Sequence, residues 1–257
     1  MGALLLIVAY AIIYCFEPFS ELWNKIITDF SLVLAASLAA TVATMIWARY
    51  EQTDTPRRIW GNFAVGLWFW AAAELIWGYL NVTQGEVPEG ISDVFWIIAY
   101  LFFAQALLFQ YRILDHPTRQ QLWSRVLIAF LIFVALYIFI FRILISDAKA
   151  PNNFGAAINS FYPAADLLLV LIALWLARHF MGGVFSRPWL GLLAFAFADL
   201  MYAWLEISGL YSWSINQANL LSTIFDIVYL SAYLVLGLGM LSQWIFLKYG
   251  LRPPVEA

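Results

Sequence analysis

The chain has 257 residues, of which 64% are apolar and only 11% are charged, and its mean hydropathy is +0.83. Soluble domains carry about 25% charged residues, so this composition excludes an ordinary soluble domain and indicates an integral membrane protein. The net charge of −3 comes without a basic patch, which excludes a nucleic-acid partner. The single cysteine, Cys15, excludes an intrachain disulfide and a cysteine-based metal site.

Eight segments approach the roughly 20 apolar residues that a helix needs to cross a bilayer core. They lie at about 1–16, 28–50, 59–80, 91–111, 122–145, 156–180, 188–209 and 217–247. Helix-stopping residues such as Pro18, Pro117 and Gly182-Gly183 separate them. The sequence therefore predicts an all-α integral membrane protein with eight transmembrane helices, the first of them short.

Basic residues gather at one set of predicted helix ends. They are Arg49, Arg57, Arg58, Arg112, Arg119, Arg125, Arg178, Arg187, Lys248 and Arg252. Only Lys25, Arg142 and Lys149 flank the other ends, where Glu86 and Glu89 make one loop acidic. By the positive-inside rule we expect both termini in the cytoplasm, with residues 248–257 as a short cytoplasmic tail.

The two halves of the chain resemble one another. Arg49, Arg58 and Trp60 match Arg178, Arg187 and Trp189 at a constant offset of 129 residues. The offset becomes 125 between Glu74 and Asp199 and 133 between Asp93 and Asp226. We therefore expect a single membrane domain over 1–247, with repeat one at about 1–120 and repeat two at about 121–247. Because each repeat has four helices, both copies keep one orientation, which predicts a parallel 4+4 repeat about an axis along the membrane normal.

Short motifs connect the chain to a known family. The runs Tyr162-Pro163-Ala-Ala-Asp166, Ala198-Asp199-Leu-Met-Tyr202 and Asp226-Ile-Val-Tyr229-Leu-Ser-Ala-Tyr233 resemble the multi-helix membrane region found N-terminal to GGDEF-type diguanylate cyclases and related bacterial signalling proteins. The first-half run from Gly90 to Tyr100 is similar to the same pattern. The resemblance covers about 49–241 and implies a sensing or docking module of the bacterial inner membrane. The chain departs from the family after Leu247, where no cyclase domain follows, so a signal would pass through another polypeptide.

Acidic residues inside the predicted helices are the candidate binding site. A charge within a membrane span costs roughly 2.5–3.5 kcal/mol on insertion scales, so each one needs a partner or a function. We expect a polar cluster that opens outward and can take a cation, a proton or a hydrogen-bonding ligand, with Arg142 as the nearest base. The predicted members are Glu74, Asp93, Asp166, Asp199, Asp226, Tyr229, Tyr233 and Arg142. The alternative is a set of interhelical hydrogen bonds that only ties the repeat together, in which the acids bond to Trp indoles and to Tyr162, Tyr202, Tyr229, Tyr233 and Asn159.

The 21 Phe, 13 Trp and 13 Tyr residues permit a groove for a lipid, a quinone or a pigment, or they serve as anchors at the membrane interface. The cofactor therefore stays unknown. No metal is expected, because His116 and His179 both sit at helix ends on the basic side, away from the acids.

These features favour a non-catalytic polytopic membrane module, either a sensor-like ligand-binding domain or an accessory subunit that docks laterally in a larger complex. The expected partners are membrane lipids and a second membrane protein or a second copy of the chain. One alternative is an intramembrane carboxylate-dependent lipid hydrolase that uses acids such as Asp199 and Asp226. Another is a small transporter, which the parallel repeat permits although helices broken by mid-membrane Gly or Pro are missing. No Ser/His/Asp arrangement or phosphate-binding glycine loop occurs, so we expect no enzyme.

Overall fold

The computed structural model describes residues 2–85, 90–146, 153–181, 183–211 and 220–250. Within these ranges all regular secondary structure is helical, and the eight predicted helices are confirmed. They are α1 (Gly2–Phe16), α2 (Glu21–Trp47), α3 (Thr55–Gln84), α4 (Ile91–Asp115), α5 (Arg119–Ser146), α6 (Asn153–His179), α7 (Arg187–Ile207) and α8 (Leu220–Tyr249). A single 3₁₀ turn, η1 (Val184–Ser186), precedes α7.

The helices α2 and α3 extend further than the apolar runs indicate, because their polar end turns are still helical. At the start of α2, the Asn24 side chain bonds both the backbone N–H and the carbonyl of Phe19, at 3.2 and 3.0 Å. At the start of α3, Pro56 occupies the first turn, where its missing N–H is not needed. Gly85 then ends α3 with a φ of 83°, a conformation that favours glycine.

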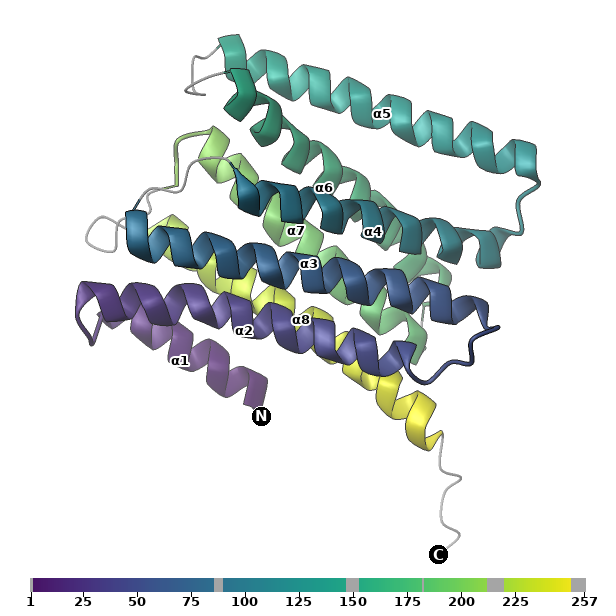
Figure 1. Ribbon diagram of the computed structural model, residues 1–257, viewed down its shortest axis with the longest axis horizontal. Helices are drawn as coiled ribbons and strands as arrows, with labels where there is room; N and C mark the ends of the chain where they lie inside the picture. Colours follow the sequence, from purple (N-terminus) through teal and green to yellow (C-terminus); the bar gives the residue numbers. More distant parts are fainter. Residues whose placement is uncertain (1, 86–89, 147–152, 182, 212–219, 251–257) are drawn as a thin grey trace, which may run out of the picture.

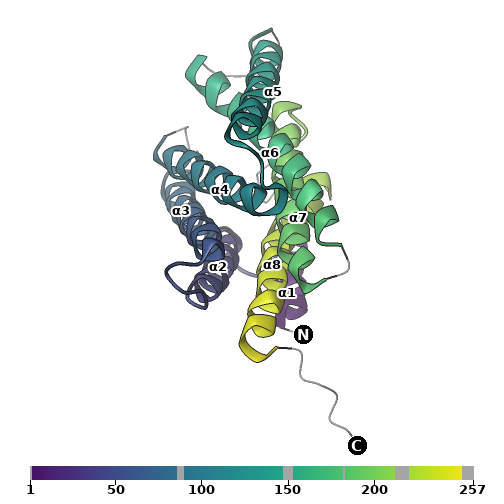
Figure 2. The ribbon, with the colours of Figure 1, turned by 90° about the vertical axis from the view of Figure 1, so that its right-hand side faces the viewer.

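Successive helices run in opposite directions and form two groups (Figure 1). In one group α3 packs between α2 and α4, and in the other α7 packs between α6 and α8. Figure 2 shows the groups side by side, with α2, α3 and α4 on one side and α6, α7 and α8 on the other. Packing of α2 against α8 joins the groups, while α4 and α6 make a smaller contact. Each half of the chain thus packs its third helix between its second and its fourth.

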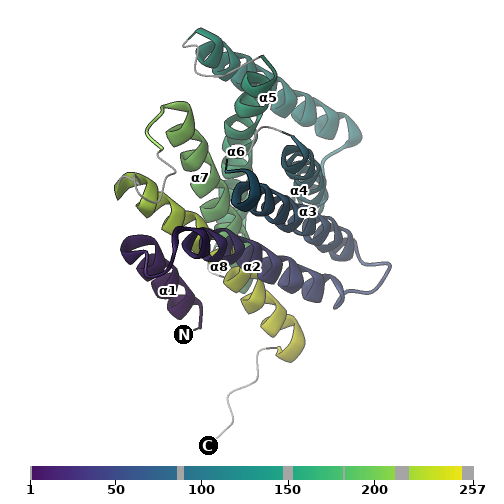
Figure 3. The ribbon, with the colours of Figure 1, turned by 60° about the vertical axis from the view of Figure 1, so that its left-hand side comes forward.

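The helices α1 and α5 lie at the rim of the bundle (Figure 3). Helix α1 packs on α2 and α8, and α5 packs on α6. The most apolar stretch of α5 contains no buried residue. Seven helices among the described residues, all except α1, are long and apolar enough to cross a membrane. The architecture is therefore that of a multi-pass membrane protein by helix length and composition.

One end of the bundle, here called the basic end, carries the start of α3, α5 and α7 and the end of α2, α4, α6 and α8 (Figure 1). It is defined by Arg49, Arg57, Arg58, Arg112, Arg119, Arg125, Arg178, Arg187 and Lys248. These are the described members of the set that the positive-inside rule assigns to the cytoplasm.

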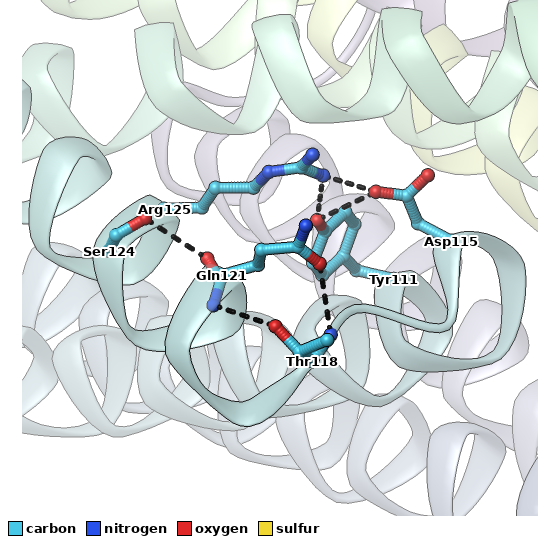
Figure 4. A network of polar contacts seen from close by, with 6 residues as sticks. All are labelled: Tyr111, Asp115, Thr118, Gln121, Ser124 and Arg125. Carbon is cyan, nitrogen blue, oxygen red and sulfur yellow. Dashed lines mark hydrogen bonds and ion pairs between the residues drawn. The ribbon is translucent and has the colours of Figure 1, made fainter.

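A polar network holds the turn between α4 and α5 at the basic end (Figure 4). The Arg125 guanidinium pairs with the Asp115 carboxylate and donates to the Tyr111 hydroxyl, which in turn donates to Asp115. Thr118 and Gln121 cap α5 reciprocally, each backbone N–H donating to the side chain of the other, at 3.0 and 3.3 Å. The turn therefore fixes where α5 begins.

Glycine lets the two last helices of the second group approach closely. A Cβ on Gly191 of α7 would lie 2.6 Å from the Leu236 Cα, and a Cβ on Gly239 of α8 would lie 2.5 Å from the Arg187 carbonyl oxygen. Gly66 has the corresponding role in the first group, where a Cβ would lie 2.7 Å from the Phe103 ring. Small residues at helix interfaces are typical of membrane bundles.

The close approach of α7 and α8 can be tested with two neighbouring glycines of α8. We expect Gly239→Ala to lower the free energy of unfolding by about 1–3 kcal/mol, because the new methyl group meets a backbone carbonyl that cannot move aside. Gly237→Ala is the matched control, since its nearest neighbour would be the Ala39 Cα at an ordinary 3.7 Å. Thermal midpoints in one detergent measure both variants, and equal midpoints would show that the glycine contact has no packing role.

The orientation of the basic end can be tested by cysteine labelling in a Cys15→Ser background. Thr83 lies near the end of α3 away from the basic end, and Gln52 follows α2 at the basic end; both side chains are exposed. We expect an impermeant maleimide to label Thr83→Cys in intact cells and Gln52→Cys only after permeabilisation. The opposite pattern would show that the positive-inside assignment is wrong.

Candidate ligand-binding cavity

A cavity of about 200 Å³ lies in the half of the bundle away from the basic end. Helices α1 to α4 and α6 to α8 all contribute to its wall, and Tyr211 after α7 completes it. Six carboxylates line it: Asp29, Glu74, Asp93, Asp199, Glu206 and Asp226. Nine aromatic residues line it as well: Tyr10, Tyr14, Trp70, Trp77, Trp96, Tyr162, Tyr202, Tyr211 and Tyr229. Leu32, Ser92, Asn159 and Ala203 make up the rest of the wall.

Helical periodicity explains why these side chains meet. On α3, Trp70, Glu74 and Trp77 are spaced by four and three residues, which puts them on one helix face. On α7, Asp199 and Glu206 follow the same seven-residue spacing. Helices α3 and α7 therefore each turn one polar stripe toward the cavity.

Glu74 is the most completely hydrogen-bonded acid of the cavity. Its side chain is 4% exposed, and its Oε1 atom accepts three bonds. The donors are Trp70 Nε1 at 3.2 Å on the same helix, and the hydroxyls of Tyr229 at 3.3 Å and Tyr233 at 2.6 Å on α8. Glu74 thus connects α3 to α8, that is, the first group of helices to the second.

Asp166 and Asp199 share one donor. The Tyr100 hydroxyl of α4 bonds Asp166 Oδ1 on α6 and Asp199 Oδ2 on α7, the latter at 2.9 Å. Asp166 is fully buried, and its second oxygen has no hydrogen-bond partner among the described residues. One tyrosine thus ties three helices together.

The bonds of Tyr100 and Tyr233 are reciprocal. Tyr100 of the first half bonds Asp199 of the second, while Tyr233 of the second half bonds Glu74 of the first. The pairs Glu74/Asp199 and Tyr100/Tyr233 have the offsets of 125 and 133 residues that relate the two halves of the sequence.

Aromatic pairs at matching positions of the two halves also contact each other. Trp60 stacks on Trp189 with ring centroids 6.1 Å apart, at an offset of 129 residues. Trp70 meets Phe195 edge to face at 4.9 Å, at an offset of 125 residues. These contacts join the two halves of the chain at matching positions.

Three further acids of the cavity also accept bonds from side chains on other elements. Tyr162 on α6 donates to Asp93, Asn81 on α3 donates to Asp29 at 2.7 Å, and Tyr211 donates to Asp226 at 2.9 Å. Burial raises the pKa of the Tyr211 phenol, so this hydroxyl stays protonated and able to donate. Glu206 near the end of α7 is exposed, so the cavity reaches the surface beside it.

The structure brings most of the predicted site residues together. Glu74, Asp93, Asp199, Asp226 and Tyr229 line the cavity. Asp166 and Tyr233 lie behind the wall and bond to the same network.

The prediction that Arg142 is the nearest base is wrong. Arg142 is exposed on α5, which packs on α6 at the rim, and it does not line the cavity. Arg142 lies about as far along its helix as the acids lie along theirs. Equal depth, however, does not show which helices are neighbours. Lys25 instead lies one helical turn before Asp29 on α2.

Several residues of the site were not among the predicted members. Asp29 was missed because α2 begins earlier than its apolar run, which places Asp29 two turns inside the helix. Glu206 is near the end of an apolar segment and could have been included on its charge alone. Tyr100 and Tyr211 carry no signal of their own among 13 tyrosines, because their partners are on other elements.

The charge of the cavity wall is one-sided. Six carboxylates line it, and among the described residues of the wall there is no Lys, Arg or His. The acids are spread around the wall, so that in the described part of the chain no three of His, Cys, Asp and Glu come close enough to share a metal ion. The wall therefore attracts positive charge over its whole surface rather than at one point.

No protein-family model, no curated protein and no solved structure gave a match to this chain. The class that the fold defines is an all-helical, multi-pass architecture with a polar cavity between two groups of helices.

The stabilising role of the tyrosine donors can be tested by removing single hydroxyls. We expect Tyr233→Phe and Tyr100→Phe each to lower the free energy of unfolding by about 0.6–1.7 kcal/mol, the range measured for hydrogen bonds between membrane helices. Tyr79→Phe is the control, since Tyr79 is 62% exposed on α3. Chemical unfolding in mixed micelles measures all three, and a control that falls as far as the cavity variants would remove the claim.

Proposed function

We propose that this chain is a non-catalytic membrane module that binds a small organic cation in its cavity from the outer side of a bacterial inner membrane. The observation that carries the proposal is the wall of six carboxylates and nine aromatic rings, to which the described part of the chain contributes no basic residue. A cation that enters supplies counter-charge to these acids. An anion would meet only repulsion there.

The aromatic rings favour an organic cation over a bare ion. Ammonium groups bind to the faces of Trp and Tyr rings at about 0.5–2 kcal/mol per contact, more when water is excluded. Trp70, Trp77 and Trp96 supply such rings from α3 and α4, while Tyr202 and Tyr229 supply them from α7 and α8. A volume of about 200 Å³ suits an amine or quaternary ammonium compound of a few carbon atoms.

We propose further that the two halves are a parallel repeat and that the ligand lies between them. The reciprocal bonds Tyr100–Asp199 and Tyr233–Glu74 and the contact of Trp60 with Trp189 support this arrangement. A ligand that touches both halves stabilises one relative position of the two groups. Through this change of relative position, a sensor-like module passes a signal along its helices to the basic end. A partner membrane protein or a second copy of the chain would bind there and respond to the change.

The intramembrane hydrolase is the weaker proposal. Hydrolysis by paired acids needs one carboxyl group to act as acid and the other as base on one substrate. Asp199 and Asp226 instead accept bonds from two different tyrosines, Tyr100 and Tyr211, on different elements. This pattern is typical of structural and binding acids, which supports a module without catalysis.

The proposal is tested with choline and its uncharged isostere 3,3-dimethylbutan-1-ol, which has the same shape without the positive charge. We expect choline to raise the thermal midpoint of the purified chain in nanodiscs in a concentration-dependent way, because a ligand that binds only the folded state stabilises it. The isostere should leave the midpoint unchanged. An equal shift of the thermal midpoint with both compounds would show that the cavity recognises the shape of the ligand rather than its charge.

Two variants that each remove one negative charge test whether choline binds in the cavity. Glu206→Gln removes one carboxylate from the exposed mouth of the cavity and should weaken choline binding. Glu21→Gln removes the same charge from an exposed position near the same end of the bundle, outside the cavity wall, and should not. Equal weakening by both would attribute the effect to surface charge and contradict the assignment of the cavity.

A further inference from the structure

A second hollow lies at the basic end, on the side of the bundle formed by α2, α3 and α4. Its volume is about 690 Å³, and it shares no residue with the acidic cavity. We call it the arginine groove, after Arg57 and Arg58, which line it. It is independent of the function proposed for the acidic cavity.

Polarity changes along the arginine groove from charged to apolar. Arg57 and Arg58 belong to the first turn of α3, together with Gln52 from the preceding loop. Further along α3, the wall continues with Ala64, Val65 and Trp68. Ten residues separate Arg58 from Trp68, which is about 15 Å along a helix and half of a bilayer core about 30 Å thick.

Neither arginine of the groove forms an ion pair within the described part of the chain. The Arg57 guanidinium donates to the Tyr50 carbonyl and lies over the Trp47 ring, 4.7 Å from its centroid, so its position is set without an ion pair. Arg58 is exposed. The nearby Asp54 carboxylate accepts from the backbone N–H of Glu51 at 2.9 Å.

Gly61, Trp47 and Trp68 shape the groove. A Cβ on Gly61 would lie 3.1 Å from Cδ1 of the Trp47 ring, so the indole packs where a side chain would otherwise stand. Trp68 donates from Nε1 to Thr44 Oγ1 at 3.1 Å and is 45% exposed. Val65 beside it is 38% exposed, so the apolar part of the groove opens toward the lipid-facing side.

We infer that the arginine groove binds one anionic phospholipid, with the phosphate group at Arg57 and Arg58 and an acyl chain along Val65 and Trp68. Guanidinium groups match phosphate oxygens in geometry, and basic pockets between helices at the cytoplasmic side suit anionic headgroups. A free anion would use only the charged part of the groove. A phospholipid uses the charged and the apolar parts together.

Native mass spectrometry of the full chain with equal amounts of dioleoyl phosphatidylglycerol and dioleoyl phosphatidylcholine tests the proposal. We expect one phosphatidylglycerol to be retained in preference. Arg58→Gln should weaken its binding roughly five-fold, and Arg57→Gln with Arg58→Gln roughly 25-fold, the loss expected for one and two charges at the membrane surface. Arg58→Gln removes an exposed side chain, so this arm stays informative if the double variant does not fold.

The matched control removes the same charge from the same end. Arg178→Gln with Arg187→Gln affects two arginines of the basic end that do not line the groove, and phosphatidylglycerol should stay bound as in the wild type. Retention of phosphatidylglycerol by the Arg57/Arg58 variant, or its equal loss in the control, would overturn the proposal. Displacement of the lipid by inorganic phosphate at constant ionic strength would overturn it too, since it would show a site for a free anion.

Discussion

The structure depends on one constraint, which is that a carboxylate inside an apolar helix must be hydrogen-bonded. A single charge in a span costs roughly 2.5–3.5 kcal/mol on insertion scales, and one interhelical hydrogen bond returns at most about 1.7 kcal/mol. Glu74 meets this constraint with three donors, two of them from another helix. Because its partners must reach it from α8, the burial of Glu74 fixes how α3 and α8 lie against each other.

The same constraint underlies the proposal that the cavity binds a cation. Tyrosine donors stabilise several of the acids singly, and all six acidic side chains share one wall. Lys25 lies one helical turn before Asp29, Arg142 is exposed on α5, and Arg57 and Arg58 belong to the arginine groove. The acidic cavity and the arginine groove thus lie toward opposite ends of the bundle. Each end is then suited to a ligand of the other sign, a cation in the cavity and a phosphate in the groove.

The helix number and the gathering of acids could be predicted from the sequence, because both follow from hydropathy and spacing along one dimension. The match of Glu74 with Asp199 and of Asp93 with Asp226 also predicted that these acids would be neighbours. The sequence predicted Tyr162, Tyr229 and Tyr233 as hydrogen-bond partners of the acids, but not Tyr100 or Tyr211, since these two become partners only when separate elements pack. The error at Arg142 has the same origin, because equal depth along the chain does not make two helices adjacent.

Double-mutant cycles on Tyr233 with Glu74 and on Tyr100 with Asp199 test the central claim most directly. The variants are Tyr233→Phe with Glu74→Gln and Tyr100→Phe with Asp199→Asn, each measured singly and in combination by equilibrium unfolding in micelles. If the acids are held by these tyrosines across the two halves, each pair should show a coupling free energy of about 0.6–1.7 kcal/mol. Strictly additive losses in both cycles would contradict the account, because the tyrosines and the acids would then stabilise the fold independently.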